Sequence, residues 1–481
     1  MKNIWRCAYI IGIIFSVVTC AGYAHKRITE WLTIETWNSQ HEKVENWAKP
    51  DLEYLEYFGL EAFETTLPVV YIDTDNQRIS KEYPIRASLA VLDEEADGEA
   101  HSILEVPDYN AAITIKYRGA SSYSGFDKKQ FRIKFYENEN SSKSKEYSFL
   151  GMGSNSEWVL NGPFLDKTLM RNRLAYKVAG EIFEWAPDTR YVEVFLDGEY
   201  QGVYLAVEPV TNGVSRLRLS KFGLLSGDTS YIVKRDRIGT EEMPLEVYGK
   251  IAAKTNNDLF VEYPGKSSLT ETQREWITND ISKFEEVLYG ENFADPVYGY
   301  AKYIDIDSFV DYYVFNEVFM NNDAGDLSTY VYKELNGKLQ MAVWDYNNCY
   351  DNYQWFTQDF KEFFVSKRAW FSRLLQDRAF VDRIIERYEE LRKDILSKEY
   401  FATLLGNFQK ELGTAIERNF AVWGYTFEAN LLIGNVEYLG INQSRDLKSY
   451  EAAVEQLKKA IDLRFEFLDN NIQELYSFCV N

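Results

Sequence analysis

Apolar residues along the chain follow two different periods, and the change between them divides the sequence into two parts. Alternating runs such as residues 69–72 and 87–91 are typical of strands. From Trp370 to Phe478 apolar residues recur every three or four positions, which indicates helices. The pattern predicts an α+β fold with antiparallel hairpins and packed helices over residues 67–357, followed by an α-helical C-terminal region over residues 358–481.

The first 27 residues have the composition of a targeting segment. Two basic residues precede an uncharged apolar run from Cys7 to Ala24, and about 18 such residues is near the minimum for crossing a bilayer. This predicts a signal anchor or a cleaved signal peptide, with lipidation at Cys20 as an open alternative. We expect residues 28–66 to form a juxtamembrane helical segment broken at Pro50. The body is then extracytoplasmic and membrane-anchored, or secreted if the segment is cleaved.

Two aspartates flank a predicted helix and hairpin. Residues 307–320 predict an apolar helix, and Asp323 follows in a short loop. Asn336-Gly337 is typical of a two-residue hairpin turn, since both residues tolerate positive φ. With that turn Ser328 lies opposite Asp345, so both acids approach one end of a hairpin whose strands are about 4.8 Å apart. The alternative is that both are ordinary turn aspartates.

A pair of acids in this arrangement suits phosphoryl transfer. Protein kinases place a catalytic-loop Asp before a hairpin and a metal-binding Asp after it. One acid orients or deprotonates the attacking hydroxyl, and the other holds the Mg²⁺ that bridges the phosphates. The reaction needs mainly positioning and neutralisation of charge, so few other groups are required.

A second predicted hairpin has a small-residue loop and a basic strand. Residues 112–117 predict a strand, residues 118–125 form a Gly/Ser-rich loop, and residues 128–135 return as a strand. Alternation places Phe131, Ile133 and Phe135 on one face and Lys128, Arg132 and Lys134 on the other. Backbone N–H groups and cations in this pattern are suited to holding phosphate. The alternative is a solvated hairpin with exposed basic residues.

Two further acids lie near predicted element ends. Asp197-Gly198 predicts a hairpin turn between residues 192–196 and 199–207, and the second strand leads to Glu208. Glu208 could pair with a lysine of the site or cap a strand edge. Asp166 precedes an apolar helix and could serve as its N-cap.

Composition narrows the choice of function. The net charge of −22 disfavours a nucleic-acid partner, because binders of the phosphate backbone usually present a basic surface. Three histidines supply little for a Ser-His-Asp or Cys-His mechanism. Only Cys349 and Cys479 of the four cysteines lie outside the apolar segment, so no disulfide framework is expected.

In order and spacing, these motifs resemble the CotH kinase family, which is related to spore-coat protein H. The likeness covers roughly residues 68–357, and the helical tail is also similar. The matching segments are Arg118–Ser122, Lys128–Arg132, Asp166–Asn172, Phe195–Tyr204 with Glu208, Asn321–Asp323 and Val343–Tyr346.

The resemblance implies an atypical protein-kinase-like fold that binds ATP with Mg²⁺ or Mn²⁺ and phosphorylates hydroxyls of an envelope or secreted protein. It implies that Asp323 is the catalytic acid and that Asp345 and residue 347 hold the metal. The expected nucleotide-binding residues are Arg118, Ser121, Ser122, Lys128, Lys129, Arg132 and Glu208.

One position departs from the family pattern. Where the family usually carries Asp or Glu, two residues after the metal-binding acid, this chain has Asn347. An amide oxygen can bind a hard cation but brings no charge, so metal binding should weaken unless Asp351 folds back to compensate. A catalytically weakened or inactive nucleotide-binding envelope protein with a structural role is therefore the alternative. A third alternative is a carbohydrate-binding or hydrolytic protein, since the chain is rich in Tyr and Trp and paired carboxylates could serve a glycosidase.

Overall fold

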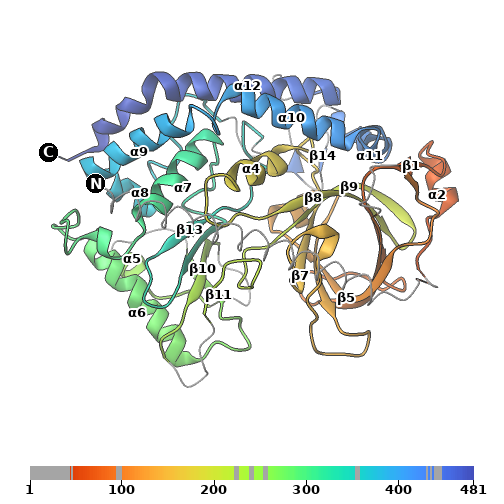
Figure 1. Ribbon diagram of the computed structural model, residues 1–481, viewed down its shortest axis with the longest axis horizontal. Coiled ribbons are helices and arrows are strands. Elements are labelled where there is room, and N and C mark those ends of the chain that lie inside the picture. Colours follow the sequence, from red (N-terminus) through yellow and green to blue (C-terminus); the bar gives the residue numbers. More distant parts are fainter. Residues whose placement is uncertain are drawn as a thin grey trace, which may run out of the picture.

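The computed structural model combines a closed β-barrel, a four-stranded sheet and a layer of helices (Figure 1). The barrel and the sheet lie at opposite ends, and α12 (Tyr450–Asn471) runs along one side from above the sheet towards the barrel. The expected targeting segment 1–27 and residues 28–43, 45 and 46 of the predicted juxtamembrane segment lie outside the described part of the chain. The structure describes residues 44, 47–93, 100–220, 227–237, 243–252, 258–352, 358–428, 432–433, 436–437 and 447–480.

The barrel is formed by the predicted strands and their neighbours. Side chains along a strand point alternately to its two faces. Phe131, Ile133 and Phe135 share one face, as predicted, and are buried inside the barrel. Antiparallel pairing runs around the barrel, and the parallel pair β2–β8 closes it. Its order is β2 (Val69–Asp73), β3 (Ile85–Leu92), β5 (Tyr109–Arg118), β6 (Gln130–Tyr136), β7 (Glu157–Asn161), β9 (Glu199–Val207) and β8 (Thr189–Leu196).

The predicted turn between β8 and β9 is confirmed. Asp197 and Gly198 both have positive φ, +50° and +88°, and Leu196 pairs with Glu199 across the turn. This is the geometry that matches the twist of the flanking strands.

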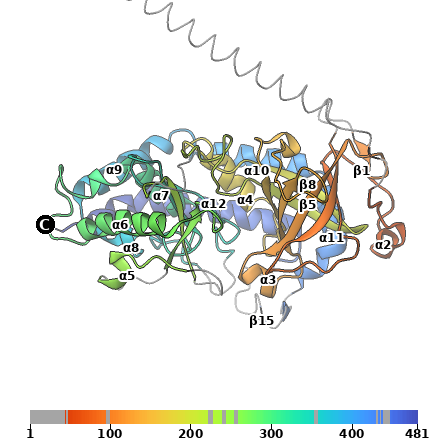
Figure 2. The same ribbon diagram turned by 90° about the horizontal axis from the view of Figure 1, so that it is seen from below.

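Residues 47–65, within the predicted helical segment 28–66, cover the outside of the barrel and contain a short helix after Pro50. Within the described part, helix α2 (Leu52–Tyr57) follows Pro50 and is capped by Asp51, and β1 (Glu64–Thr65) pairs with β4 (His101–Ser102). Apolar side chains of this segment pack on Tyr71 and Phe195. Figure 2 shows α2 at the end of the molecule farthest from α5 and α6. Among the described helices, none combines the length and hydrophobicity needed to cross a bilayer.

The four-stranded sheet carries the predicted helix and hairpin. Its antiparallel order is β11 (Asp258–Tyr263), β10 (Tyr231–Asp236), β12 (Thr329–Lys333) and β13 (Gln340–Ala342). Helix α7 (Ile306–Val318) confirms the predicted apolar helix, and the side chain of Asp305 caps it.

The predicted two-residue turn at Asn336-Gly337 is wrong by one position. Tyr330 pairs with Ala342, which places Ser328 in register with Trp344 instead of Asp345. The turn is wider because Leu339 is held elsewhere: its N–H donates to Tyr303 O, and its carbonyl accepts from the N–H of Asp305, both at 2.9 Å. Gly337 N–H instead closes a turn onto Glu334 O.

The helices of the C-terminal region are part of the main core. One cluster of buried side chains extends from Leu67 to Leu475, so the core is continuous across the predicted boundary at residues 357 and 358. The remaining helices are α3 (Ser121–Gly125), α4 (Arg171–Ala179), α5 (Tyr248–Ile251), α6 (Glu271–Leu288), α8 (Ala369–Leu374), α9 (Arg378–Leu391), α10 (Lys398–Leu412) and α11 (Ala415–Trp423). Short 3₁₀ turns span Phe149–Gly151, Tyr300–Lys302, Gly424–Phe427 and Ile472–Phe478, and β14 (Leu432–Ile433) pairs with β15 (Val436–Glu437).

A buried ion pair joins α12 to α7. Arg464 Nη2 lies 2.7 Å from Glu317 Oε2, and the same guanidinium donates to the carbonyls of Glu317, Phe360 and Glu362. Both side chains are buried. We expect Arg464→Met to lower the free energy of unfolding by about 3–5 kcal/mol, because it leaves a buried carboxylate without its cation.

Chemical denaturation would measure this loss. Arg392→Met is the matched control, since Arg392 also bridges to α12, through Asp469, but the aspartate is 41% exposed. Its loss should be about 1 kcal/mol or less. Equal effects of the two variants would contradict the role of burial.

Candidate active site

Two loops bring Asp323 and Asp345 together. Asp323 lies after α7, and Asp345 lies three residues after β13. Asn348 Nδ2 donates to Asp323 Oδ2 at 3.4 Å, so the two loops touch. Burial, together with the negative charges of Asp323 and Asp236 and against the charge of Arg118, raises the pKa of Asp345 to about 6. The two acids are thus close enough to interact electrostatically despite the shift in hairpin register.

The loop of Asp323 is shaped by the end of α7. Met320 has φ +52°, and Asn321 N–H donates back to Asn316 O at 3.1 Å, which ends the helix sharply. The Asn321 side chain then holds both neighbours: Nδ2 donates to Asn316 Oδ1, and Oδ1 accepts from Asp323 N–H. Arg368 secures the far side by donating to the carbonyl of Asn322.

The carboxylate of Asp323 is half-buried and has an elevated pKa. Burial is the main cause of the rise, and the nearby positive charges of Arg237 and Arg368 oppose it. A carboxylate held in this way binds a proton more readily than an exposed one, which suits a general base.

Asp345 has a backbone conformation that is unusual for a residue other than glycine. Its φ is +65°, a region that L-residues rarely adopt. Among the described residues its carboxylate accepts no hydrogen bond, whereas its N–H donates to Tyr176 Oη at 3.0 Å. Such outliers concentrate at functional sites, where the surrounding structure enforces them.

Asn347 presents a buried oxygen with no hydrogen-bond donor. Within the described chain its Oδ1 has no partner, while its Nδ2 donates to Asn348 Oδ1. Its own carbonyl accepts from Asn352 Nδ2 at 2.7 Å, which fixes the loop. An unsatisfied buried amide oxygen two residues after a free carboxylate fits a hard cation such as Mg²⁺. The described residues hold no group of three or more His, Cys, Asp or Glu that could bind a metal without other ligands.

Arg118 reaches the site from the barrel. Its guanidinium lies over the Trp344 ring, 5.4 Å from the centroid, and donates to Gln130 Oε1 at 2.6 Å. Its charge acts on Asp345. The barrel therefore contributes a cation and the sheet contributes the acids.

Comparison with known proteins identifies the family. The family model described as CotH kinase protein matches residues 115–468. The chain belongs to the CotH family. It is also 25% identical over 253 residues to the inner spore coat protein H of Bacillus subtilis, a match that covers 52% of this chain and 62% of that relative. The matched part is thus less than two thirds of the relative's length.

The match to the CotH family contains both acids and most of α12. It starts within β5, before Arg118, and continues past the predicted boundary at residue 357. The family model therefore includes the helical region up to residue 468, in agreement with the continuous core.

Two predicted phosphate-binding lysines of this CotH chain hold the protein together instead. Lys128 is buried, and its Nζ donates to Val203 O and Asn419 Oδ1, linking the barrel to α11. Lys128 lies before β6 begins at Gln130, so the in-out alternation of strand side chains does not place Lys128 on the same face as Arg132. Lys129 Nζ donates to the carbonyls of Tyr123 and Phe126. Among the described residues, neither ammonium group contacts Asp323 or Asp345.

The predicted Gly/Ser loop is a single helical turn. Ser121 and Ser122 begin α3, and Gly119 before them has φ +87°. A side chain at Gly119 would lie 2.0 Å from Ser122 Oγ, so this glycine allows the serine to pack against the strand end. The structure places both serines near Arg118 in the chain and shows no contact between their hydroxyls and the acids among the described residues.

Arg132 lies on the outer surface of the barrel, on the side of the four-stranded sheet, and pairs with an acid that the sequence analysis did not predict. Its guanidinium pairs with Glu157 on β7, and Lys134 Nζ binds the same carboxylate at 2.9 Å. The negative charge of Glu262, from β11, also acts on Arg132. Only the β6–β7 register reveals this pairing, because Lys134 lies opposite Glu157.

Glu208 and Asp351 lie outside the site. Glu208 forms a buried ion pair with Arg216 and accepts from Asp188 N–H, so it binds an arginine and not a site lysine. Burial raises its pKa to about 7. Asp351 is buried, and its Oδ1 accepts from Gln358 N–H at 2.7 Å, so it closes a loop and does not replace the charge missing at Asn347.

Proposed function

We propose that this chain is a metal-dependent, kinase-like phosphotransferase that moves the γ-phosphoryl group of ATP to a hydroxyl of a protein. The observation that carries the proposal is the meeting of Asp323 and Asp345 from separate loops, beside the unsatisfied oxygen of Asn347. Family membership supports the same chemistry.

The residues divide into two roles. Asp345 and Asn347 would hold Mg²⁺ or Mn²⁺, with phosphate and water oxygens as the other ligands, an arrangement that Mg²⁺ prefers. The bound cation would neutralise charge on the phosphates. Arg118, and Arg132 farther out, would bind phosphate oxygens from the barrel side.

The transfer step needs one base. The oxygen of the substrate hydroxyl would bond to the γ-phosphorus while Asp323 accepts the proton of that hydroxyl. The bond between the γ-phosphorus and the oxygen that bridges it to the β-phosphorus breaks, which releases ADP. Burial of Asp323 raises its pKa and favours this proton transfer.

We further propose that the acceptor is an envelope or coat protein and that the chain acts outside the cytoplasm. The relative's name places that protein in the inner spore coat. The N-terminal apolar run agrees with export and with a membrane anchor. The acidic net charge of −22 argues against nucleic-acid partners.

Asn347→Asp is expected to strengthen Mn²⁺ binding about tenfold, because it adds a charged ligand where a neutral one now stands. Calorimetric titration of Mn²⁺ would measure it. Asn348→Asp is the control, since it adds the same charge one residue away, on a side chain that contacts Asp323. An equal gain from both variants would show a general field effect and contradict ligation by residue 347.

A second function is favoured by one observation: the described residues hold no group of three or more His, Cys, Asp or Glu that could bind a metal, and position 347 supplies a neutral amide. A protein with this site could bind nucleotide without turnover and serve as a structural component. Incubating the purified chain with γ-labelled ATP and Mg²⁺ or Mn²⁺ separates the two. Labelled protein supports phosphotransfer. Metal-dependent binding without labelling supports the structural role, and the absence of both refutes both proposals.

A further inference from the structure

Helix α4 touches the loop of Asp345 at three successive points. Tyr176 Oη accepts from Asp345 N–H at 3.0 Å, and Asn172 Oδ1 accepts from Tyr346 N–H at 2.8 Å. Arg171 Nε donates to Cys349 O at 3.0 Å. Asn172 and Tyr176 are four residues apart, so they lie on one face of the helix.

This loop needs support from outside. Asp345, Tyr350 and Asp351 all have positive φ, between +53° and +65°, although none is glycine. Left-handed residues interrupt the strand ladder, so their N–H groups lose the partners that a strand would supply. In this loop the Tyr176 hydroxyl accepts the hydrogen bond from Asp345 N–H, and the Asn172 side-chain amide oxygen accepts that from Tyr346 N–H.

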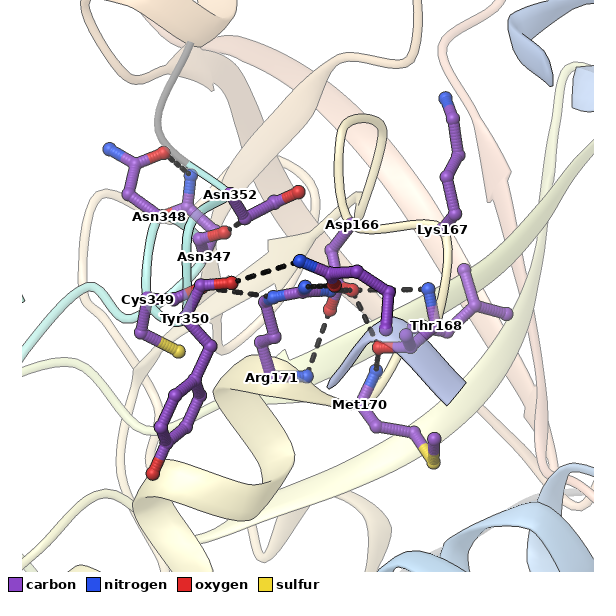
Figure 3. A network of polar contacts seen from close by, with 12 residues as sticks. Asp166, Lys167, Thr168, Met170, Arg171, Asn347, Asn348, Cys349, Tyr350 and Asn352 are labelled. Atoms are coloured by element: carbon purple, nitrogen blue, oxygen red, sulfur yellow. Dashed lines mark hydrogen bonds and ion pairs between the residues drawn. The ribbon is translucent and has the colours of Figure 1, made fainter. Parts of the chain in front are cut away.

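The α4 end is fixed by an acid that the proposed reaction does not use. Met170 precedes the helix and has no capping side chain, but Asp166 Oδ2 accepts from Arg171 N–H at 2.8 Å. Asp166 Oδ1 also binds Arg171 Nη1 at 2.6 Å. Figure 3 shows Arg171 lying between Asp166 and the Cys349 carbonyl. The buried pair thus aligns both the helix and the loop.

The C-terminal helix secures the same arginine. Gln456 of α12 accepts from Arg171 Nη2 at 2.9 Å through Oε1, and its Nε2 donates to Tyr350 O at 3.5 Å. The support of the loop therefore extends from α4 to α12. This gives the Asp166–Asn172 motif a physical task that the transfer chemistry leaves unexplained.

We propose that Asn172 and Tyr176 are positioning residues that hold Asp345 in its left-handed conformation and so direct its carboxylate to the metal. The inference rests on the proposed function for the metal, but the hold on the loop exists without it. Asp166 and Arg171 support both residues by fixing α4.

The test uses Tyr176→Phe and Asn172→Ala in the full chain. Tyr176→Phe removes one oxygen and keeps the ring packing on Trp344 and Tyr346. Tyr71→Phe is the matched control, because its buried hydroxyl also makes one backbone hydrogen bond, to Ile103 O at 2.8 Å, on the outside of the barrel.

Two measurements are made on each variant. Amide hydrogen exchange of Asp345 and Tyr346 should become about tenfold faster in the α4 variants and stay unchanged in Tyr71→Phe, since one hydrogen bond is lost at each amide. The dissociation constant for Mn²⁺ should rise about tenfold in the α4 variants alone, because the ligand is no longer held in place.

The outcomes distinguish this inference from the proposed function. Faster exchange with weaker Mn²⁺ binding supports the positioning role. Unchanged exchange, or faster exchange with unchanged Mn²⁺ affinity, overturns it while leaving the proposed function intact. If the unmodified chain binds no Mn²⁺, the proposed function fails and the positioning role fails with it.

Discussion

Asp323→Asn is expected to lower phosphate transfer about 10³-fold while leaving the affinity for metal and nucleotide nearly unchanged. The substitution keeps the size of the side chain and removes its capacity to take a proton. Among the described residues, the carboxylate of Asp323 accepts only the long hydrogen bond from Asn348 Nδ2, so little structure depends on its charge. Labelled transfer and calorimetric binding, measured on the same preparation, would separate the two effects.

Asp307→Asn serves as the control for loss of one negative charge at the opposite end of α7. Asp307 lies in the first turn of α7 and is 69% exposed, with its carboxylate paired to Arg383. It should transfer phosphate at the unmodified rate. An Asp323→Asn protein with full activity would end the assignment of the base, and one that no longer binds nucleotide would place Asp323 in binding instead.

Local sequence patterns were sufficient to predict strands, turns and helices whose conformation depends on residues close in the sequence. Alternation in β6 correctly placed Phe131, Ile133 and Phe135 in the barrel, and Asp197-Gly198 correctly predicted its turn. These features depend on neighbours in sequence. The apolar helix α7 was predictable for the same reason.

Features that depend on distant contacts were missed or misplaced. The prediction of a two-residue turn at Asn336-Gly337 was wrong because the backbone of Leu339 hydrogen-bonds to Tyr303 and Asp305. No local sequence pattern reveals these contacts. Lys128 looked like a phosphate ligand, but α11 contributes Asn419 almost 300 residues away and buries it.

In the candidate site, too, some residues could be predicted from local sequence and others act through tertiary contacts that the sequence does not reveal. Asp323 and Asp345 could be found because each follows a recognisable element. Tyr176 and Glu157 could not, since a buried tyrosine on an apolar helix and an acid at the first position of a strand carry no distinctive signal. Their roles follow from the tertiary contacts to Asp345 N–H and to Arg132.

Asp345→Ala is expected to abolish metal-dependent nucleotide binding, with a loss of about 10²-fold or more, because it removes the charged protein ligand of the cation. Binding of nucleotide without metal should be unchanged, since Arg118 remains. Calorimetry with ATP in the presence of Mg²⁺ and in EDTA would measure the two components.

Alanine at this position also changes the backbone, so a second variant is needed. With φ at +65°, alanine is strained by roughly 1–2 kcal/mol, whereas asparagine tolerates the left-handed region. Asp345→Asn therefore isolates the charge: it should keep the loop and the Tyr176 contact, yet lose most of the metal-dependent affinity. If Asp345→Asn binds Mg²⁺-ATP as tightly as the unmodified chain while Asp345→Ala does not, the residue acts through loop conformation and the metal must be held elsewhere.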